Sequence, residues 1–176
     1  MATSASPCAG VRLLAGNEFP VPASERYFED YAPGLAREYG YVTVTEAEVR
    51  AFAERFDPQP MHTDPAFAAT GPFGGLIASG WHTAGIFMRL FVDHYLPGAA
   101  SLGSPGLDEL RWPAPVRPGD TLRMRVTTLE ARPSRSKPDR GLVRTRGELI
   151  NQEEQDVLSL VAMNIFRRRP APGTGH

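Results

Sequence analysis

The sequence has one cysteine, Cys8, among its 176 residues, and one lysine, Lys137. A single cysteine cannot form an internal disulfide or supply the thiolate cluster of a zinc site, so we predict a cytoplasmic protein. Net charge is almost absent too, since 19 basic residues stand against 20 acidic ones and the formal charge is −1. That balance argues against a nucleic-acid partner, which requires a broad positive surface.

Long uncharged hydrophobic runs are also missing. The most apolar stretch, residues 76–96, contains Arg89, Asp93 and two histidines, whereas a membrane span needs about 18 or more uncharged residues. The N-terminal residues lack a basic segment followed by an apolar one, so no signal peptide is expected. We therefore predict no membrane partner.

Proline and glycine are abundant instead, with 17 of each, and proline is about twice as frequent as its usual ~5%. The length favours one domain. Small residues, glycine and proline dominate segments 1–22 and 170–176. We therefore predict a loosely ordered N-terminal segment, one domain at 23–169 and a flexible C-terminal tail.

Two helix starts can be recognised from capping residues. Thr45 and Glu48 form a capping box, and the apolar spacing after them predicts a helix that stops at Asp57, because Pro58 disfavours helical geometry in the residue before it. Asp64-Pro65 predicts the N-cap and first residue of a second, short helix. We prefer that role for Asp64 to the role of a third acid.

The remaining elements follow from hydrophobic periodicity. The stretch 76–96 is apolar nearly all round, which predicts a long buried helix. Alternating patterns predict five strands, the last four as an antiparallel meander, at 37–44, 107–112, 121–131, 141–151 and 157–168. One long helix against one antiparallel sheet gives an α+β fold with a single core.

Asp57 and His62 are the residues best suited to acid–base chemistry. A carboxylate and an imidazole can share a water molecule and move protons near neutral pH. Pro58 and Pro60 stiffen the turn between them, which lowers the entropy cost of holding both side chains toward one point. Singly, each residue is also an ordinary turn or core residue, and the residues alone leave both interpretations open.

The segment at 56–87, FDPQPMHTDPAFAATGPFGGLIASGWHTAGIF, resembles the active-site segment of MaoC-like dehydratases and (R)-specific enoyl-CoA hydratases. RWPAPVRPGDTL at 111–122 is similar to their usual strand-to-strand signature. The resemblance implies a single hot-dog domain, in which an antiparallel β-sheet wraps a long central helix. It also implies a homodimer with an acyl-binding tunnel near the subunit interface.

The resemblance also assigns roles to residues. Asp57 and His62 match the catalytic pair, and Gly80 matches the glycine whose backbone N–H binds the thioester oxygen. A helix start favours that role independently, because its N–H groups and dipole attract negative charge. Ser79, which precedes the glycine where the family often has histidine, is a second candidate for binding the thioester oxygen or the substrate. Gln59 stands where the family often has asparagine. We expect both differences to affect substrate range and rate more than reaction type.

Trp81 and His82 fall in the first turn of the long helix and are possible pocket residues, together with Gln59. Packing or solvent contact is an equal interpretation for His82. No metal or redox cofactor is implied, since coenzyme A belongs to the substrate. The residues Arg132, Arg135, Lys137 and Arg140 make a basic loop that meets either coenzyme A phosphates or only water.

The implied reaction is reversible hydration of a trans-2-enoyl-CoA, or of an enoyl-carrier protein, to an (R)-3-hydroxyacyl thioester. An acyl-CoA thioesterase on the same fold stays open as an alternative. It would require a carboxylate well inside the long helix, where the sequence has only Asp93 near the end. A non-catalytic subunit that binds acyl thioesters also stays open.

Overall fold

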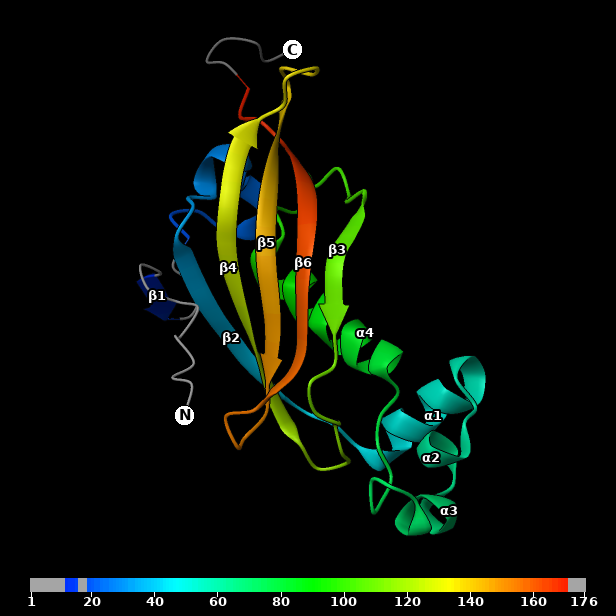
Figure 1. Ribbon diagram of the computed structural model, residues 1–176. Coiled ribbons are helices and arrows are strands. Elements are labelled where there is room, and N and C mark those ends of the chain that lie inside the picture. Colours follow the sequence, from blue (N-terminus) through cyan, green and yellow to red (C-terminus); the bar gives the residue numbers. More distant parts are fainter. Residues whose placement is uncertain (1–11, 16–18, 171–176) are drawn as a thin grey trace, which may run out of the picture.

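The computed structural model describes residues 12–15 and 19–170 and contains one six-stranded sheet (Figure 1). The strands are β1 (Arg12–Ala15), β2 (Leu35–Thr43), β3 (Gly106–Arg111), β4 (Thr121–Pro133), β5 (Arg140–Ile150) and β6 (Asp156–Arg167). They lie in the order β1-β2-β4-β5-β6-β3. β1 runs parallel to β2, and all other neighbours are antiparallel.

The predicted strands are confirmed, but the predicted four-strand meander is wrong. Only β4, β5 and β6 follow one another across the sheet, while β3 pairs with β6 and β2 lies beside β4. The chain that precedes β3 is already tied to β6, because the Leu102 N–H donates to the Ile165 carbonyl and the Ile165 N–H to the Gly103 carbonyl. β3 therefore continues along β6 and forms an edge of the sheet.

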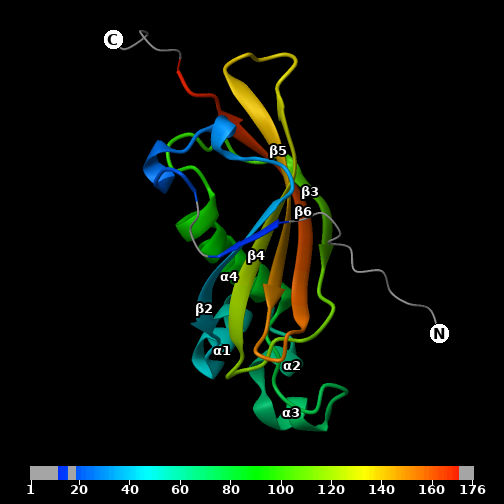
Figure 2. The same cartoon turned by 90° about the vertical axis from the view of Figure 1, so that its left-hand side faces the viewer.

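The helices are α1 (Glu46–Phe56), α2 (Pro60–Thr63), α3 (Pro65–Thr70) and α4 (Gly80–Leu90), and α4 continues into a π-helical turn at Phe91–Tyr95. Short 3-10 turns at Ala23–Glu25 and Phe28–Asp30 precede β2. α1 to α3 gather at one end of the molecule, whereas the tip of the β4–β5 hairpin lies at the other (Figures 1 and 2). No helix of the described residues has the length and apolar character to span a membrane.

Both predicted helix caps are confirmed. Thr45 Oγ1 accepts from the Glu48 N–H at 3.2 Å, and the Glu48 carboxylate accepts from the Thr45 N–H at 3.0 Å, which completes the capping box. The Asp64 carboxylate accepts from the first two free N–H groups of α3. α1 ends at Phe56 with Asp57 as its C-cap, as Pro58 requires. The sequence did not predict α2, a single turn inside the proline-rich segment.

The long helix begins at Gly80, the helix start that the resemblance implies, and not at residue 76, where the apolar stretch begins. The Ile77 N–H donates to the carbonyl of Met61 in α2, and the Ala78 N–H donates to the carbonyl of Val116 in the loop before β4, so these residues are held between α2 and that loop. Ser79 then caps the helix by accepting from the Trp81 N–H. The start of α4 is thereby fixed beside α2.

α4 lies on one face of the sheet (Figure 2). Phe87 packs against the sheet at Gly147, where any side chain would overlap the phenylalanine ring. The opposite side of the helix is exposed in the single chain, with Met88 47% and Val92 49% accessible. The prediction of a helix buried all round is therefore wrong for one chain, although the α+β fold with a long helix along an antiparallel sheet is confirmed.

Two parts of the N-terminal segment 1–22 fall within the described residues. Within the segment expected to be loosely ordered, Arg12–Ala15 forms β1, and Phe19 is buried. The Phe19 ring lies between two buried guanidinium groups, 3.9 Å from Arg26 and 3.8 Å from Arg37, so cation–π attraction holds it in place. Residues 1–11, 16–18 and 171–176 lie outside the described part of the chain.

Candidate active site

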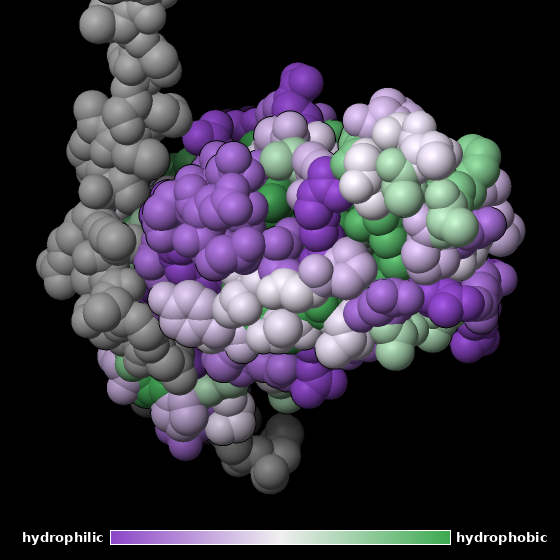
Figure 3. All heavy atoms as spheres, turned by 90° about the horizontal axis from the view of Figure 1, so that it is seen from below, coloured by the Kyte–Doolittle hydropathy of each residue, from purple (hydrophilic) through white to green (hydrophobic). Residues whose placement is uncertain are grey.

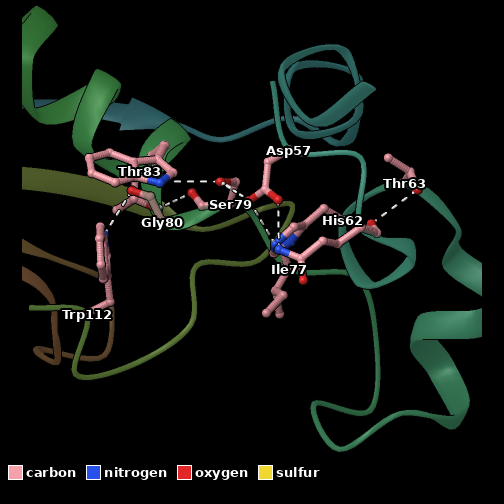
Figure 4. Close-up of polar contacts among 10 residues, drawn as sticks. Asp57, His62, Thr63, Ile77, Ser79, Gly80, Thr83 and Trp112 are labelled. Carbon is pink, nitrogen blue, oxygen red and sulfur yellow. Dashed lines mark hydrogen bonds and ion pairs between the residues drawn. The ribbon is translucent and has the colours of Figure 1, made fainter. Parts of the chain in front are cut away.

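Asp57 and His62 come together where α1 gives way to α2. Asp57 is the C-cap of α1, and His62 lies in α2, separated from it by the stiff turn that contains Pro58 and Pro60. His62 Nε2 lies 3.5 Å from Asp57 Oδ2 (Figure 4). The imidazole is almost fully buried, whereas the carboxylate side chain is 19% exposed. The predicted pair is therefore within reach of one shared water molecule.

The second ring nitrogen of His62 fixes its tautomer. Nδ1 lies 2.8 Å from the carbonyl oxygen of Ile77, which can only accept a hydrogen bond, so Nδ1 carries the proton. In the neutral ring, Nε2 then presents a lone pair toward Asp57 Oδ2. Two acceptors 3.5 Å apart do not bond to each other. A water molecule beside them can donate one hydrogen to each, which leaves its oxygen lone pairs free for an electrophile.

Two further side chains hold the Asp57 carboxylate. Ser79 Oγ donates to Oδ2 at 2.7 Å, and Gln59 Nε2 donates to Oδ1 at 2.7 Å. These two hydrogen bonds hold the pKa of Asp57 below its usual value. The carboxylate is therefore ionised and oriented at neutral pH. Gln59 and Ser79, the two positions at which the sequence departs from the residues usual in the resemblance, therefore both contact the carboxylate of Asp57.

Gly80 lies beside this pair as the first residue of α4. Its N–H has no acceptor within the helix, because the first N–H groups of any helix lack partners. Trp112 Nε1 donates to the Gly80 carbonyl at 2.8 Å, and a Cβ on residue 80 would lie 2.7 Å from the Trp112 ring (Figure 4). Glycine is therefore required by the packing of Trp112, in addition to its predicted role as a donor.

A cavity of about 400 Å³ connects these groups. Its lining includes Asp57, Gln59, His62, Gly80, Trp81 and Trp112. Trp81 and Trp112 meet edge to face with ring centroids 5.6 Å apart. Trp81 also lines a neighbouring apolar cavity of about 260 Å³ between α4, β3 and β6. The acid–base pair thus opens onto enough space for a small acyl group.

The end of the molecule that carries α1 to α3 is partly apolar at its surface. Phe56, Phe67 and Phe73 are all exposed in the single chain. Viewed from this end, hydrophobic residues gather on the side of these helices, and the hydrophilic β5–β6 turn at 151–155 covers the other side (Figure 3).

Other candidate residues lie elsewhere. His82 is not part of the cavity lining, because its ring stacks on Phe52 of α1 with centroids 5.1 Å apart. Burial lowers the pKa of His82, and its Nδ1 has no hydrogen-bond partner among the described residues. The packing interpretation of His82 is therefore the correct one. Asp64 caps α3 instead of facing the cavity.

The basic loop also lies away from the site. The loop joins β4 to β5 at the end of the molecule opposite α1 to α3 (Figures 1 and 2). Arg132 pairs with Glu130 at 3.0 Å, and Arg140 pairs with Asp139 at 2.7 Å. Within one chain, this loop is therefore a solvated hairpin away from Asp57 and His62, and contact with coenzyme A phosphates stays a prediction.

Sequence reasoning missed Trp112, Thr83 and the carbonyl of Ile77. Trp112 and Thr83 line the cavity, and the Ile77 carbonyl sets the His62 tautomer. Trp112 was within reach of prediction, because it opens the Trp-Pro-Ala-Pro segment that resembles the family signature. A backbone carbonyl carries no residue-specific signal.

A long helix along an antiparallel sheet defines a hot-dog fold, and in this protein Asp57 and His62 lie together beside the start of that helix. A family model described as the MaoC like domain matches residues 32–148. The chain belongs to the family of MaoC-like dehydratases.

Solved structures are similar to most of this chain, and a curated relative is similar to about half of it. The crystal structure of the MaoC-like dehydratase from Rhodospirillum rubrum is 43% identical, with a TM-score of 0.77, and the match covers 83% of this chain and 99% of that one. The R-hydratase PhaJ1 from Pseudomonas aeruginosa is 25% identical, with a TM-score of 0.66, over 85% of this chain and 96% of that one. The 3-hydroxyacyl-thioester dehydratase Z of Mycobacterium tuberculosis is 41% identical over 85 residues, which are 47% of this chain and 56% of that protein.

Proposed function

We propose that this protein catalyses the reversible hydration of trans-2-enoyl-CoA, or of the corresponding carrier-protein thioester, to the (R)-3-hydroxyacyl thioester. The observation that carries the proposal is the pair of acceptors formed by Asp57 Oδ2 and His62 Nε2, 3.5 Å apart at the cavity wall. They lie beside the Gly80 N–H, which the helix leaves without an acceptor. This arrangement suits a nucleophilic water and a developing oxyanion.

Each group has a role in hydration. The water held by Asp57 and His62 attacks C3 of the enoyl thioester and forms the new C–O bond. One water proton passes to the acid–base pair while the double-bond electrons move to the thioester oxygen. The Gly80 N–H and the positive end of α4 stabilise this enolate. The pair then returns the proton to C2, so no net proton is consumed.

An ionised Asp57 carboxylate can accept the proton that water loses when it attacks C3. Hydrogen bonds from Ser79 and Gln59 lower the pKa of Asp57 and keep the carboxylate charged at neutral pH. Because the two groups share one water, the proton belongs to the pair during turnover. The (R) configuration of the product is supported by the resemblance and by the R-hydratase among the similar structures.

The thioesterase alternative has no supporting residue in α4. Asp93, the carboxylate near the end of the long helix, lies in the π-helical turn and pairs with Arg89 at 2.8 Å on the surface. It is not among the residues that line the cavity of Asp57 and His62. A non-catalytic binding role would leave the ordered acid–base pair without a use.

One assay separates these functions. Purified protein is incubated with crotonyl-CoA and with longer enoyl-CoAs, while the conjugated thioester absorbance and the release of free thiol are followed together. Loss of absorbance without thiol, with an (R)-3-hydroxyacyl product on chiral analysis, is the expected result. Thiol release would instead support the thioesterase. A chain that binds the thioester but changes neither signal would be a binding subunit.

The proposal includes a homodimer joined near β3. This edge strand carries unpaired backbone groups, and the apolar Leu107 and Trp112 beside it are 50% and 41% exposed. The exposed side of α4 continues the same apolar surface with Met88 and Val92. Light scattering after size-exclusion chromatography should give twice the chain mass, and Leu107→Asp should shift it toward the monomer. A wild-type monomer at micromolar concentration would contradict the dimer.

A further inference from the structure

We infer that Gln59 is a positioning residue of the site. By binding Oδ1, it holds the Asp57 carboxylate in the orientation in which Oδ2 alone takes part in proton transfer. This inference rests on the proposed function and names a role for a side chain that does not itself touch the reacting atoms. Besides Gln59, the described part of the chain gives the Asp57 carboxylate one other side-chain hydrogen-bond donor, Ser79, which contacts Oδ2.

Side-chain geometry supports the assignment. Gln59 Nε2 donates to Oδ1 at 2.7 Å, while Ser79 donates to Oδ2 on the side of His62. A carboxylate held by one hydrogen bond still rotates about the Cβ–Cγ bond, whose torsion is soft. Two donors on different oxygens remove that rotation. Gln59 therefore keeps Oδ2 toward the shared water and occupies Oδ1.

The backbone of Gln59 links both reactive residues. Its N–H donates to the Asp57 carbonyl at 2.8 Å, and its carbonyl accepts from the His62 N–H at 2.9 Å. Pro58 and Pro60 flank it and fix the neighbouring φ angles. The residue that orients Asp57 is thus tied by its main chain to the turn that carries His62, so both groups move together.

Because the Gln59 side chain is exposed, its effect on the Asp57 carboxylate can be tested without disturbing the fold. The Gln59 side chain is exposed and contributes no buried apolar surface, so its loss should leave the fold unchanged. Gln152 in the β5–β6 turn supplies a control, because its Nε2 donates to Asp120 Oδ1 at 2.8 Å and neither residue lines the cavity of Asp57 and His62. The Oε1 of Gln152 also accepts from the Thr121 N–H. Gln59 and Gln152 both make a glutamine-to-aspartate hydrogen bond, but only one of these aspartates faces His62.

The test compares wild type, Gln59→Leu and Gln152→Leu in hydration of crotonyl-CoA across a pH series. Gln59→Leu should lower kcat by about tenfold, the loss expected for one hydrogen bond to a charged group, with KM almost unchanged. The acid limb of its kcat profile should move to higher pH, because Asp57 loses a donor to its charged form. Gln152→Leu should have the kcat and the acid limb of wild type. Unchanged kcat and an unchanged acid limb in Gln59→Leu would overturn the inference.

A second readout does not depend on turnover. The Asp57 carboxyl carbon is titrated by NMR with ¹³C-labelled aspartate, assigned through Asp57→Asn. Its pKa should rise in Gln59→Leu and stay at the wild-type value in Gln152→Leu. Equal titration of Asp57 in all three proteins would refute the contact. A wild-type protein that fails to hydrate any enoyl thioester would refute the proposed function, and the titration would still decide the Gln59 contact.

Discussion

His62 Nδ1 lies 2.8 Å from the carbonyl oxygen of Ile77, so the ring turns its unprotonated Nε2 toward Asp57. This contact determines which ring nitrogen can accept a proton from water. We predict that ¹⁵N spectra of the histidine rings at neutral pH show His62 as the Nδ1–H tautomer. His62→Gln provides the assignment. Observation of the Nε2–H tautomer would mean that the ring donates to Asp57 and cannot act as the acceptor described above.

Gly80 and Trp112 should depend on each other. A methyl group at residue 80 would lie 2.7 Å from the Trp112 ring, so Gly80→Ala must displace the indole or the start of α4. Because this moves the N–H proposed to bind the oxyanion, we expect kcat/KM for crotonyl-CoA to fall by about a hundredfold.

The double variant separates packing from donor geometry. Trp112→Ala removes the overlapping ring, so adding it to Gly80→Ala should restore part of the lost activity relative to Trp112→Ala alone. Strictly additive losses in this double-mutant cycle would show that the two residues act independently.

Asp57 should contribute a pH-dependent part of stability. Its pKa is lowered in the folded chain, so the stabilisation is present above the unfolded value of about 3.9 and is lost as the pH falls through the folded value. Urea unfolding of wild type and of Asp57→Asn at about pH 6 and about pH 3 measures the difference in their free energies of unfolding at each pH. The stability of wild type relative to the variant should be greater at the higher pH. A difference that grows on acidification would contradict the lowered pKa.

Packing of α4 on the sheet gives a stability prediction. A side chain at Gly147 would overlap the Phe87 ring, so Gly147→Ala should lower the free energy of unfolding by about 1–3 kcal/mol, as overpacking does. Phe87→Leu in the same chain should recover part of this loss by making room for the methyl group. If Gly147→Ala unfolds at the wild-type urea concentration, α4 does not rest on this part of the sheet.

Local rules predicted the elements whose signals lie within a few residues. The Thr45–Glu48 capping box and Pro58 gave both ends of α1, and Asp64-Pro65 gave the start of α3. The position of β3 beside β6 depends on contacts about 50 residues apart, such as Leu110 opposite Leu160. Hydrophobic periodicity carries no information about such pairing, which explains why the predicted meander was wrong.

In the candidate site, too, local signals were predictable from the sequence and contacts made by folding were not. That Asp57 and His62 lie together was predictable from residue type, spacing and resemblance, and their catalytic role stays a proposal. The roles of Gln59 and Ser79 were not predictable, because each depends on a hydrogen-bond geometry that only the folded turn defines. The cytoplasmic location and the homodimer stay predictions.

The most direct test of the account is hydration of crotonyl-CoA by Asp57→Asn, compared with wild type and with Asp93→Asn, which changes an aspartate on the surface. Circular dichroism confirms that each protein is folded. Because a side-chain amide at residue 57 could not accept the water proton, kcat should fall by about a thousandfold, within the range of general acid–base catalysis, while Asp93→Asn retains wild-type activity. Wild-type turnover by folded Asp57→Asn would contradict the assignment of Asp57 and His62 as the catalytic pair.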